Sequence, residues 1–524
     1  MLVSIIPGFV PQNDPELLEK AKASRPKLNK MQLAPLRYLS GDTWEAAEGL
    51  KEKELGLGDQ VTLDFGRHAV GHVSLDFGIR GSHQDAPLWV RLEMAERLEE
   101  LEERWDTYRG WISPSWLQRE EYHLDSLPCT LSPERRFAFR YVRITVLGVS
   151  RKFRVTVNKA EAIAQSAADW DRVPERRFFE KDLQRIYDAS LMTLSECTQD
   201  VMEDGPKRDR RLWLGDLKLQ AETSYISFQS LSVIRRCLYL FAGSRFPDGR
   251  LSANVFTDPE IAGDDTYLMD YALFFLDVLC DYVEHAGDRE ALNDLHETAL
   301  FQMEYVLERC QNGLISPESA GDFFIDWSDD LDKWAAAQGI VILALNAAER
   351  LCGLLGDTER AGDCRKKAEE FRRAARAEFY DPEKGLCLSR GQVSLHTQVF
   401  LTLSGVMTPE EGILAIRKAE EVPGSPGMMT PYMHHYYLLA LLMAGEKDAA
   451  LHHMRLYWGS MLEGGADTFF EAWDPEDPTS SPYGGSQVNS YCHAWSCTPA
   501  RILVEYYPEQ YLEMPVEKTQ EADT

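Results

Sequence analysis

The pattern of hydrophobic positions changes once along the chain, near residue 170. From about 59 to 165, apolar and polar residues alternate with a period of two, which is typical of strands with one buried face. We interpret QVTLDFGRHAVGHVSLDFGIRG as two short strands around a glycine-containing turn, and we expect a turn at Gly148 and Ser150 between RFAFRYVRITVLG and RKFRVTVNKAEAIA. PLWVRLEMAERL continues the alternation. The sequence therefore predicts an antiparallel β-sandwich over 59–165.

The flanks of this region lack a clear period. Residues 1–58 are expected to be irregular, apart from a short helix at 15–24 that Asp14 caps and Pro15 begins. Residues 166–180 are polar and contain a proline, so we interpret them as a linker.

From 181 to 507 the apolar residues recur at helical spacing in about a dozen segments, such as KDLQRIYDASLMTLSECTQ and TPYMHHYYLLALLMAG. Many of them end with glycine, the usual left-handed cap. Several are apolar all round, as buried helices are. The absence of an exact repeat makes a solenoid less suitable, and the pattern favours an α/α barrel. The acidic tail at 508–524 is expected to be frayed.

Composition narrows the possible partners. The 524 residues suffice for two or three domains, and 44% are hydrophobic. A net charge of −29 argues against nucleic acid and anionic membranes as partners. The ten cysteines lie mostly in apolar segments without metal-type spacing, which indicates free thiols in a reducing compartment. The sequence shows neither a signal peptide nor a run of about 20 apolar residues, so we expect a cytoplasmic protein. We also expect neither a metal nor a cofactor.

The segment DGPKRDRRLWLGD, residues 204–216, has the most unusual composition in the chain. Its thirteen residues include three acids and four basic residues between two apolar helical segments. Gly205 and Pro206 oppose regular structure, so we expect a charged loop. Loops on rigid scaffolds often carry binding and catalytic groups. A solvated turn with salt bridges is the ordinary alternative.

Two further loops combine acids with aromatic residues. In GGADTFFEAWDPEDP, Glu471 lies among phenylalanines and Trp473. A carboxylate in such surroundings is desolvated and can hold or take a proton near neutrality, although capping or pairing with an arginine is an alternative. In FFIDWSDDLDKW, Asp326 beside Trp327 offers a hydroxyl-binding acid next to a flat apolar face, which suits a sugar; a helix start is the alternative there.

Other candidates are weaker. His493 in SYCHAWSCTPARIL and the pair His434 and His435 are more often core residues. Asp264 and Asp265 precede a helical segment and are expected to cap it. Without Cys or acids at ligand spacing, the histidines do not predict a metal site. Acids with aromatics, but no basic groove and no phosphate-binding glycine loop, favour a neutral carbohydrate ligand. Two opposed carboxylates are what glycosidic cleavage needs.

These segments resemble glycoside hydrolase family 78, the α-L-rhamnosidases, over most of 60–507. The strongest matches are DGPKRDRRLWLGD, the run from TPYMHHYYLL to TFFEAWDP, and CHAWSCTP. The resemblance implies a β-sandwich followed by an (α/α)6 barrel. It also implies inverting exo-hydrolysis of terminal α-L-rhamnosyl or related deoxy-sugar linkages. The further β-sandwich that many members carry after the barrel has no counterpart in the sequence.

The resemblance also implies roles for individual residues. Asp209 falls where the family places its general acid, usually a Glu, and Glu471 matches the general base. The other positions are expected to bind a rhamnosylated glycoside or oligosaccharide. They are Asp204, Arg208, Trp213, Asp216, Asp326, Trp327, Trp473 and His493, and Asp216 is alternatively expected to tune the acid.

Two other functions are compatible with the same scaffold. One is a catalytically silent carbohydrate-binding protein, in which Asp209 reflects a lost acid function. The other is a polysaccharide lyase, in which Arg208, Arg210 and Arg211 recruit the carboxylate of a uronic acid.

Overall fold

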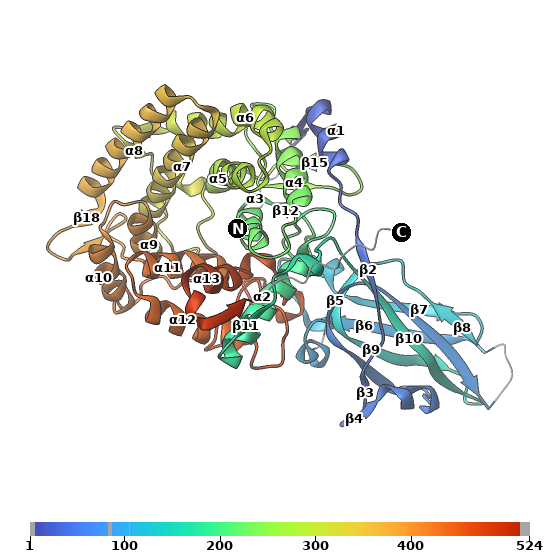
Figure 1. Cartoon of the computed structure of the whole chain (residues 1–524). Helices are drawn as coiled ribbons and strands as arrows, with labels where there is room; N and C mark the ends of the chain where they lie inside the picture. The colour runs from blue at the N-terminus through green and yellow to red at the C-terminus, as the bar shows by residue number, and fades with distance from the viewer. Residues whose placement is uncertain (1–5, 82–85, 104, 514–524) are drawn as a thin grey trace.

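The structure is a computed structural model, and it describes residues 6–81, 86–103 and 105–513. A β region occupies the N-terminal third, and a larger helical region follows it (Figure 1). The two predicted classes of secondary structure therefore occur in the predicted order.

The β region is built on one antiparallel sheet of nine strands. Its order is β2-β10-β5-β9-β6-β7, with β3 pairing both β4 and β5, and β8 pairing β5. The strands are β2 (Asn29–Leu33), β3 (Arg37–Ser40), β4 (Thr43–Ala46), β5 (Gln60–Arg80), β6 (Leu88–Ala95), β7 (Arg119–Leu124), β8 (Cys129–Leu131), β9 (Phe137–Val149) and β10 (Arg154–Ser166).

Strand β5 differs from the prediction of two short strands, because it runs unbroken for 21 residues. Its pairing with β9 shifts register between Asp64 and Ala69, and Gly66 in between has a φ of 80°. A glycine in the left-handed region is the usual device of a β-bulge, which bends a strand without ending it. A turn does separate β9 from β10 and includes Ser150, but Gly148, also predicted to be in it, lies within β9.

The N-terminal segment is more regular than predicted. Helix α1 (Pro15–Ala23) begins as expected, with the Asp14 side chain accepting from two backbone amides. The expectation of an irregular chain is wrong over 29–46, where β2 pairs with β10 and β3 pairs with β5. Those partners lie far away in the sequence, so local composition does not reveal them. Likewise β11 (Arg176–Phe178), in the expected linker, pairs with β20 (Tyr511–Glu513) near the C-terminus.

The helical region consists of twelve helices after α1. They are α2 (Lys181–Cys197), α3 (Leu214–Tyr225), α4 (Leu231–Gly243), α5 (Met269–Ala286), α6 (Arg289–Leu307), α7 (Trp334–Leu355), α8 (Thr358–Phe379), α9 (Leu395–Leu403), α10 (Pro409–Glu420), α11 (Pro431–Met443), α12 (Lys447–Met461) and α13 (Pro499–Tyr506). Gly287 and Gly356 cap α5 and α7 in the left-handed conformation, as predicted.

Contacts among alternate helices close on themselves. Helix α3 contacts α5, and the series continues through α7, α9 and α11 to the short helix η8 (Ala494–Ser496), which contacts α3. Helices α4, α6, α8, α10 and α12 each pack against members of this cycle. Within the described residues, α7 alone is long and apolar enough to cross a membrane. Most of it is buried among other helices, as in the core of a helical domain.

Candidate active site

A cavity of about 450 Å³ lies where the loops before α3, α5 and α7 and the loop after α12 meet an arm of the β region. Eight of the ten predicted site residues line it. They are Asp204, Arg208, Asp209, Trp213, Asp216, Trp327, Glu471 and His493. Residues from distant parts of the sequence thus surround one space, as the resemblance implies.

The loop at 204–216 is held closed by its own backbone. The Asp204 amide donates to the Arg211 carbonyl, and the Arg211 amide donates to Asp204 Oδ1, both at 3.0 Å. Between them, Asp209 and Arg210 have left-handed φ values of 63° and 54°. Asp is one of the few residues other than glycine that adopt this region readily. The alternative of a solvated turn is wrong, because Asp204 and Lys207 are among its buried residues.

The loop after α12 is fastened beside the first loop. The Glu471 amide donates to the Ser490 carbonyl at 3.0 Å, and the Ala494 amide donates to the Asp204 carbonyl at 2.9 Å. A Cβ atom on Gly205 would lie 2.9 Å from Ser490 Oγ, so glycine permits this close approach. Backbone contacts therefore fix Glu471 relative to the charged loop.

Arg208 joins the two predicted catalytic carboxylates. Its guanidinium donates to Asp209 Oδ2 at 3.3 Å and to Glu471 Oε2. The Tyr483 hydroxyl also donates to Glu471, and the Arg208 guanidinium lies 4.1 Å from the centre of the Tyr483 ring. Burial would lower the pKa of Arg208, but the Glu471 carboxylate outweighs it and holds this pKa well above its ordinary value. Glu471 does pair with an arginine, and that arginine belongs to the same cavity.

The floor of the cavity is polar and incompletely satisfied. Burial, together with Asp209 for Asp204 and with Glu471 for Asp216, raises the pKa of these two aspartates well above the ordinary range. Burial and the nearby arginine lower the pKa of His493 well below its usual value, so its ring is neutral. Its Nδ1 lies 3.5 Å from Asp216 Oδ1.

Three buried polar atoms at this floor make no hydrogen bond to any residue that the structure describes. They are Asp216 Oδ1, His493 Nδ1 and Trp327 Nε1. An unsatisfied buried polar group costs about 1–3 kcal/mol. Donors and acceptors gathered without partners around one cavity are suited to a ligand rich in hydroxyl groups.

Two of the predicted residues do not line the cavity. The Asp326 carboxylate accepts hydrogen bonds from His396 Nε2 at 2.9 Å and Thr430 Oγ1 at 2.7 Å, so it ties core elements together. The Trp473 indole donates to Ser460 Oγ at 2.8 Å. Both lie beside loops that do reach the cavity, which is why their local sequence looked the same.

The cavity wall contains further residues that were not predicted from the sequence. Tyr483 comes from the turn-rich segment SPYGG, and Trp111 and Trp116 come from the arm between β6 and β7. Trp111 Nε1 donates to the carbonyl of Pro482 at 3.1 Å, which fastens the arm to the helical region. The sequence signal that could have identified them is the presence of aromatic residues inside turn-rich loops.

The capping role expected of Asp264 and Asp265 is wrong, since α5 begins only at Met269 and both aspartates line the cavity. His434 and His435 are buried in α11, as expected of core residues. Among the residues that the structure describes, no group of three or more His, Cys, Asp and Glu side chains could hold a metal ion.

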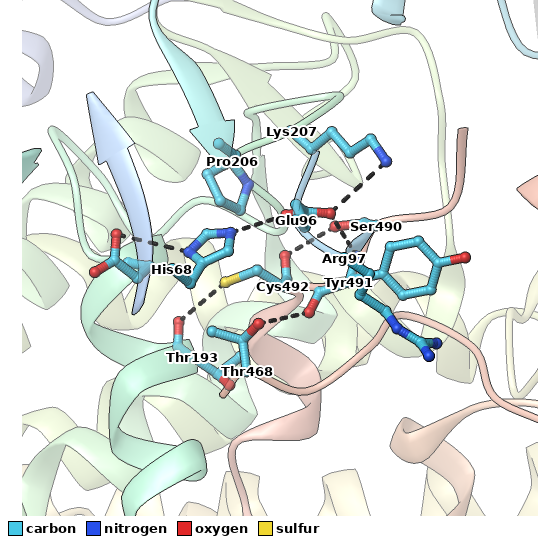
Figure 2. A network of polar contacts seen from close by, with 12 residues as sticks. His68, Glu96, Arg97, Thr193, Pro206, Lys207, Thr468, Ser490, Tyr491 and Cys492 are labelled. Atoms are coloured by element: carbon cyan, nitrogen blue, oxygen red, sulfur yellow. Dashed lines mark hydrogen bonds and ion pairs between the residues drawn. The ribbon is translucent and has the colours of Figure 1, made fainter. Parts of the chain in front are cut away.

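Buried charges outside the cavity lining connect the β region to both loops (Figure 2). His68 Nε2 lies 3.1 Å from Glu96 Oε1, and Glu96 Oε2 accepts from the Tyr491 amide at 2.7 Å. Lys207 binds the Glu100 carboxylate and lies 3.8 Å from Glu96. We call His68, Glu96, Glu100 and Lys207 the clamp. It fixes the loop that carries Arg208 and the segment that precedes His493.

Comparison with protein families assigns both regions of the chain. Residues 35–164 match the glycosyl hydrolase family 78 alpha-rhamnosidase N-terminal domain. Residues 179–506 match the bacterial alpha-L-rhamnosidase 6 hairpin glycosidase domain. The chain therefore belongs to glycoside hydrolase family 78, the family of the α-L-rhamnosidases, and it is a glycoside hydrolase.

Solved structures agree with this assignment. A rhamnosidase from Klebsiella oxytoca with rhamnose bound is 40% identical, with a TM-score of 0.90 over 95% of this chain and 99% of that one. A family 78 rhamnosidase of Bacillus sp. GL1 has 21% identity and a TM-score of 0.72, covering 86% of this chain and 47% of its own. The α-L-rhamnosidase of Streptomyces avermitilis complexed with L-rhamnose is 18% identical, with a TM-score of 0.66. The match covers 92% of this chain and 44% of that one. The last two show the fold alone. The comparison with curated proteins found no match.

Proposed function

We propose that this glycoside hydrolase is an α-L-rhamnosidase. In this proposal it removes terminal α-L-rhamnosyl groups, or those of a related deoxy-sugar, with inversion at the anomeric carbon. The observation that carries the proposal is the pair of carboxylates, Asp209 and Glu471, on one cavity and on one guanidinium. The 40% identity to a rhamnosidase with rhamnose bound supports this choice of sugar.

The exposure of the two side chains supports their different roles. The Asp209 side chain is 22% exposed and that of Glu471 only 6%. The leaving group must face the open end of the cavity, so the acid that protonates it belongs at the mouth and the base belongs deeper. A Glu471 carboxylate takes a proton from water while the water oxygen attacks the anomeric carbon. The glycosidic bond breaks, and the leaving oxygen takes the proton of Asp209.

The sugar would be held by the unsatisfied atoms at the cavity floor. Asp204 and Asp216 are suited to accept hydrogen bonds from sugar hydroxyls, and neutral His493 can donate or accept one. Trp327 offers both an indole N–H and an apolar face. A polyol supplies partners to the buried atoms of Asp216, His493 and Trp327 that have none among the described residues, which favours binding of a sugar over an apolar ligand.

The finer architecture and the location belong to the same proposal. We infer that the closed cycle of α3, α5, α7, α9, α11 and η8 is the inner layer of an (α/α)6 barrel. We also infer that the nine-stranded sheet folds over into a β-sandwich. The cytoplasmic location and the lack of nucleic-acid and membrane partners stay predictions from cysteine usage and net charge.

The direct test follows the anomeric product by proton NMR during hydrolysis of an aryl α-L-rhamnoside. Inversion predicts β-L-rhamnose as the first product, with the α anomer appearing only through mutarotation. First appearance of the α anomer would contradict inversion while keeping the activity. Calorimetric binding of rhamnose without any turnover would instead favour the silent binding protein, and an unsaturated product absorbing in the near ultraviolet would favour a lyase.

A further inference from the structure

Three arginines of the loop before α3 differ in what their guanidinium groups bind. Arg208 is occupied by Glu471 and Asp209. Arg210 donates to two backbone carbonyl oxygens, each at 2.8 Å. The Arg211 guanidinium has no hydrogen bond or ion pair within 6–81, 86–103 and 105–513. Arg211 is thus the one of the three whose donors remain available.

The surrounding strands place Arg211 at the cavity wall. Strand β12 (Leu212–Trp213) pairs antiparallel with β14 (Asn254–Phe256), with Leu212 opposite Val255. The next position along each strand sets Arg211 against Phe256, and the guanidinium carbon lies 4.5 Å from the centre of that ring. Both residues line the cavity. A guanidinium that contacts a ring and makes no hydrogen bond keeps its N–H donors available for a planar anion.

The acids nearby do not neutralise this arginine. Asp264 accepts from Asn254 Nδ2 at 2.9 Å and from Thr266 Oγ1 at 2.8 Å. Asp265 accepts from a backbone amide at 2.6 Å, and neither forms an ion pair with Arg211. Acids outnumber lysines and arginines in this chain by 85 to 56. Arg211 has no acidic partner despite this excess, and its position on the cavity makes the carboxylate of a ligand a suitable partner.

Aromatic faces extend the cavity beyond the two carboxylates. Trp111 lies 5.6 Å from Tyr483 and 6.5 Å from Trp327, measured between ring centres. Trp116 also lines the cavity, beside the guanidinium of Arg210 at 5.9 Å. A cavity of about 450 Å³ lies within the range that holds drug-sized ligands, so a single sugar ring does not fill it. Flat aromatic faces suit the C–H faces of a second ring.

We propose that the cavity also binds the residue that carries the rhamnosyl group, and that this residue is a hexuronic acid whose carboxylate pairs with Arg211. The inference rests on the proposed rhamnosidase function and names its substrate class. The ring of the uronic acid lies against the aromatic wall, and its carboxylate accepts hydrogen bonds from two N–H groups of the Arg211 guanidinium. The enzyme then acts on oligosaccharides that end in a rhamnosyl-uronic acid unit.

The test compares a disaccharide of α-L-rhamnose linked to glucuronic acid with the methyl ester of the same disaccharide. The measured quantity is the ratio of the two kcat/KM values at pH 7. The wild type is expected to favour the acid about 10- to 100-fold, the range of a charge-assisted pair of hydrogen bonds. Arg211→Gln should bring the ratio close to one, and Arg211→Lys should keep part of it, because lysine retains the charge without the fork.

The matched control is Arg309→Gln. Arg309 also lies over an aromatic ring, Tyr305, at 3.4 Å, but it does not line the cavity. This variant should keep the wild-type ratio. Because the ratio is taken within each variant, a partial loss of folding changes both rates equally and leaves the ratio intact.

Two results would overturn the inference: a wild-type ratio near one, or a ratio that Arg211→Gln leaves unchanged. Hydrolysis of a neutral aryl α-L-rhamnoside separates this failure from failure of the proposed function, since that substrate needs no carboxylate site. If the wild type hydrolyses none of the three substrates, the proposed function is wrong. Calorimetry with the acid and its ester then tests the subsite alone, and equal affinities would overturn it.

Discussion

The cavity and the clamp share one loop, but the buried charged groups of the clamp are paired, whereas several buried polar atoms of the cavity are not. In the clamp, the Lys207 ammonium is buried against Glu100 and Glu96. In the cavity, Asp216 and His493 keep atoms without any described partner. Buried charges that are paired hold loops in place. Buried polar groups without partners lower the stability of the fold and are available to bind a ligand. The difference separates the residues that position the site from those that act in it.

Two consecutive residues of this loop connect the clamp to the cavity. Lys207 joins the clamp, and Arg208, its neighbour, binds both Asp209 and Glu471 in the cavity. The clamp therefore sets where the backbone of Arg208 lies. A functional site needs such a supporting layer, because a misplacement of about 1 Å can cost about 100-fold in rate.

The largest expected effect is the loss of turnover in Glu471→Gln. Removing the base should lower kcat on an aryl α-L-rhamnoside by about 10²–10⁴-fold, the usual contribution of general acid–base catalysis. Initial rates measure it, and a thermal midpoint near that of the wild type shows that the fold is kept. A kcat close to the wild-type value would show that Glu471 is not the base. It would also contradict the distinction between acting residues in the cavity and positioning residues in the clamp.

The second effect tests the clamp. Lys207→Met leaves the buried carboxylates of Glu100 and Glu96 without their cation, and it should lower the free energy of unfolding by about 3–5 kcal/mol. Urea denaturation measures this loss. Lys447→Met is the matched control, since Lys447 donates only to a carbonyl at an exposed site and should change stability by less than about 0.5 kcal/mol. Equal shifts in the two variants would contradict a structural role for the clamp.

The third prediction has the opposite sign. Asp216→Asn should stabilise the protein by about 0.5–2 kcal/mol at pH 8 while reducing activity, the usual trade-off at a functional site. Burial and Glu471 raise the pKa of Asp216 in the folded state. Stability is therefore complete below the unfolded pKa of this group and is lost as the pH rises through the folded value. The gain in Asp216→Asn should shrink toward pH 4, and destabilisation at pH 8 would refute this reading of the cavity.

The smallest effect concerns His68. Burial would lower the pKa of His68, but Glu96 outweighs it and the net shift is upward. Its contribution is thus present below the unfolded pKa of about 6.5 and is lost as the pH rises through the folded pKa. Above pH 6.5, the free energy of unfolding should fall less steeply with pH in His68→Gln than in the wild type. The two slopes should differ by at most about 1.4 kcal/mol per pH unit, the value for one proton. Parallel profiles of variant and wild type would show that His68 does not titrate with folding.

The secondary-structure elements could be predicted from the sequence, but many contacts between distant elements could not. Alternation and helical periodicity are local, so β9, β10 and most helices were predictable. The charged loop and the loop of Glu471 were recognisable by composition. By contrast, Trp111 reaches the cavity through contacts with residues more than 370 positions away, which no local pattern records. Asp326 shows the reverse error, since only its bonds to His396 and Thr430 decide that it faces the core.

One measurement tests the central assignment most directly: the dependence of kcat/KM on the leaving group in Asp209→Asn and Glu471→Gln. A dinitrophenyl rhamnoside needs no protonation of its leaving oxygen, whereas a methoxyphenyl rhamnoside does. If Asp209 is the acid and Glu471 the base, Asp209→Asn keeps most of its rate on the activated substrate and loses it on the other. Glu471→Gln loses both. Equal losses on the two substrates in Asp209→Asn would contradict the account.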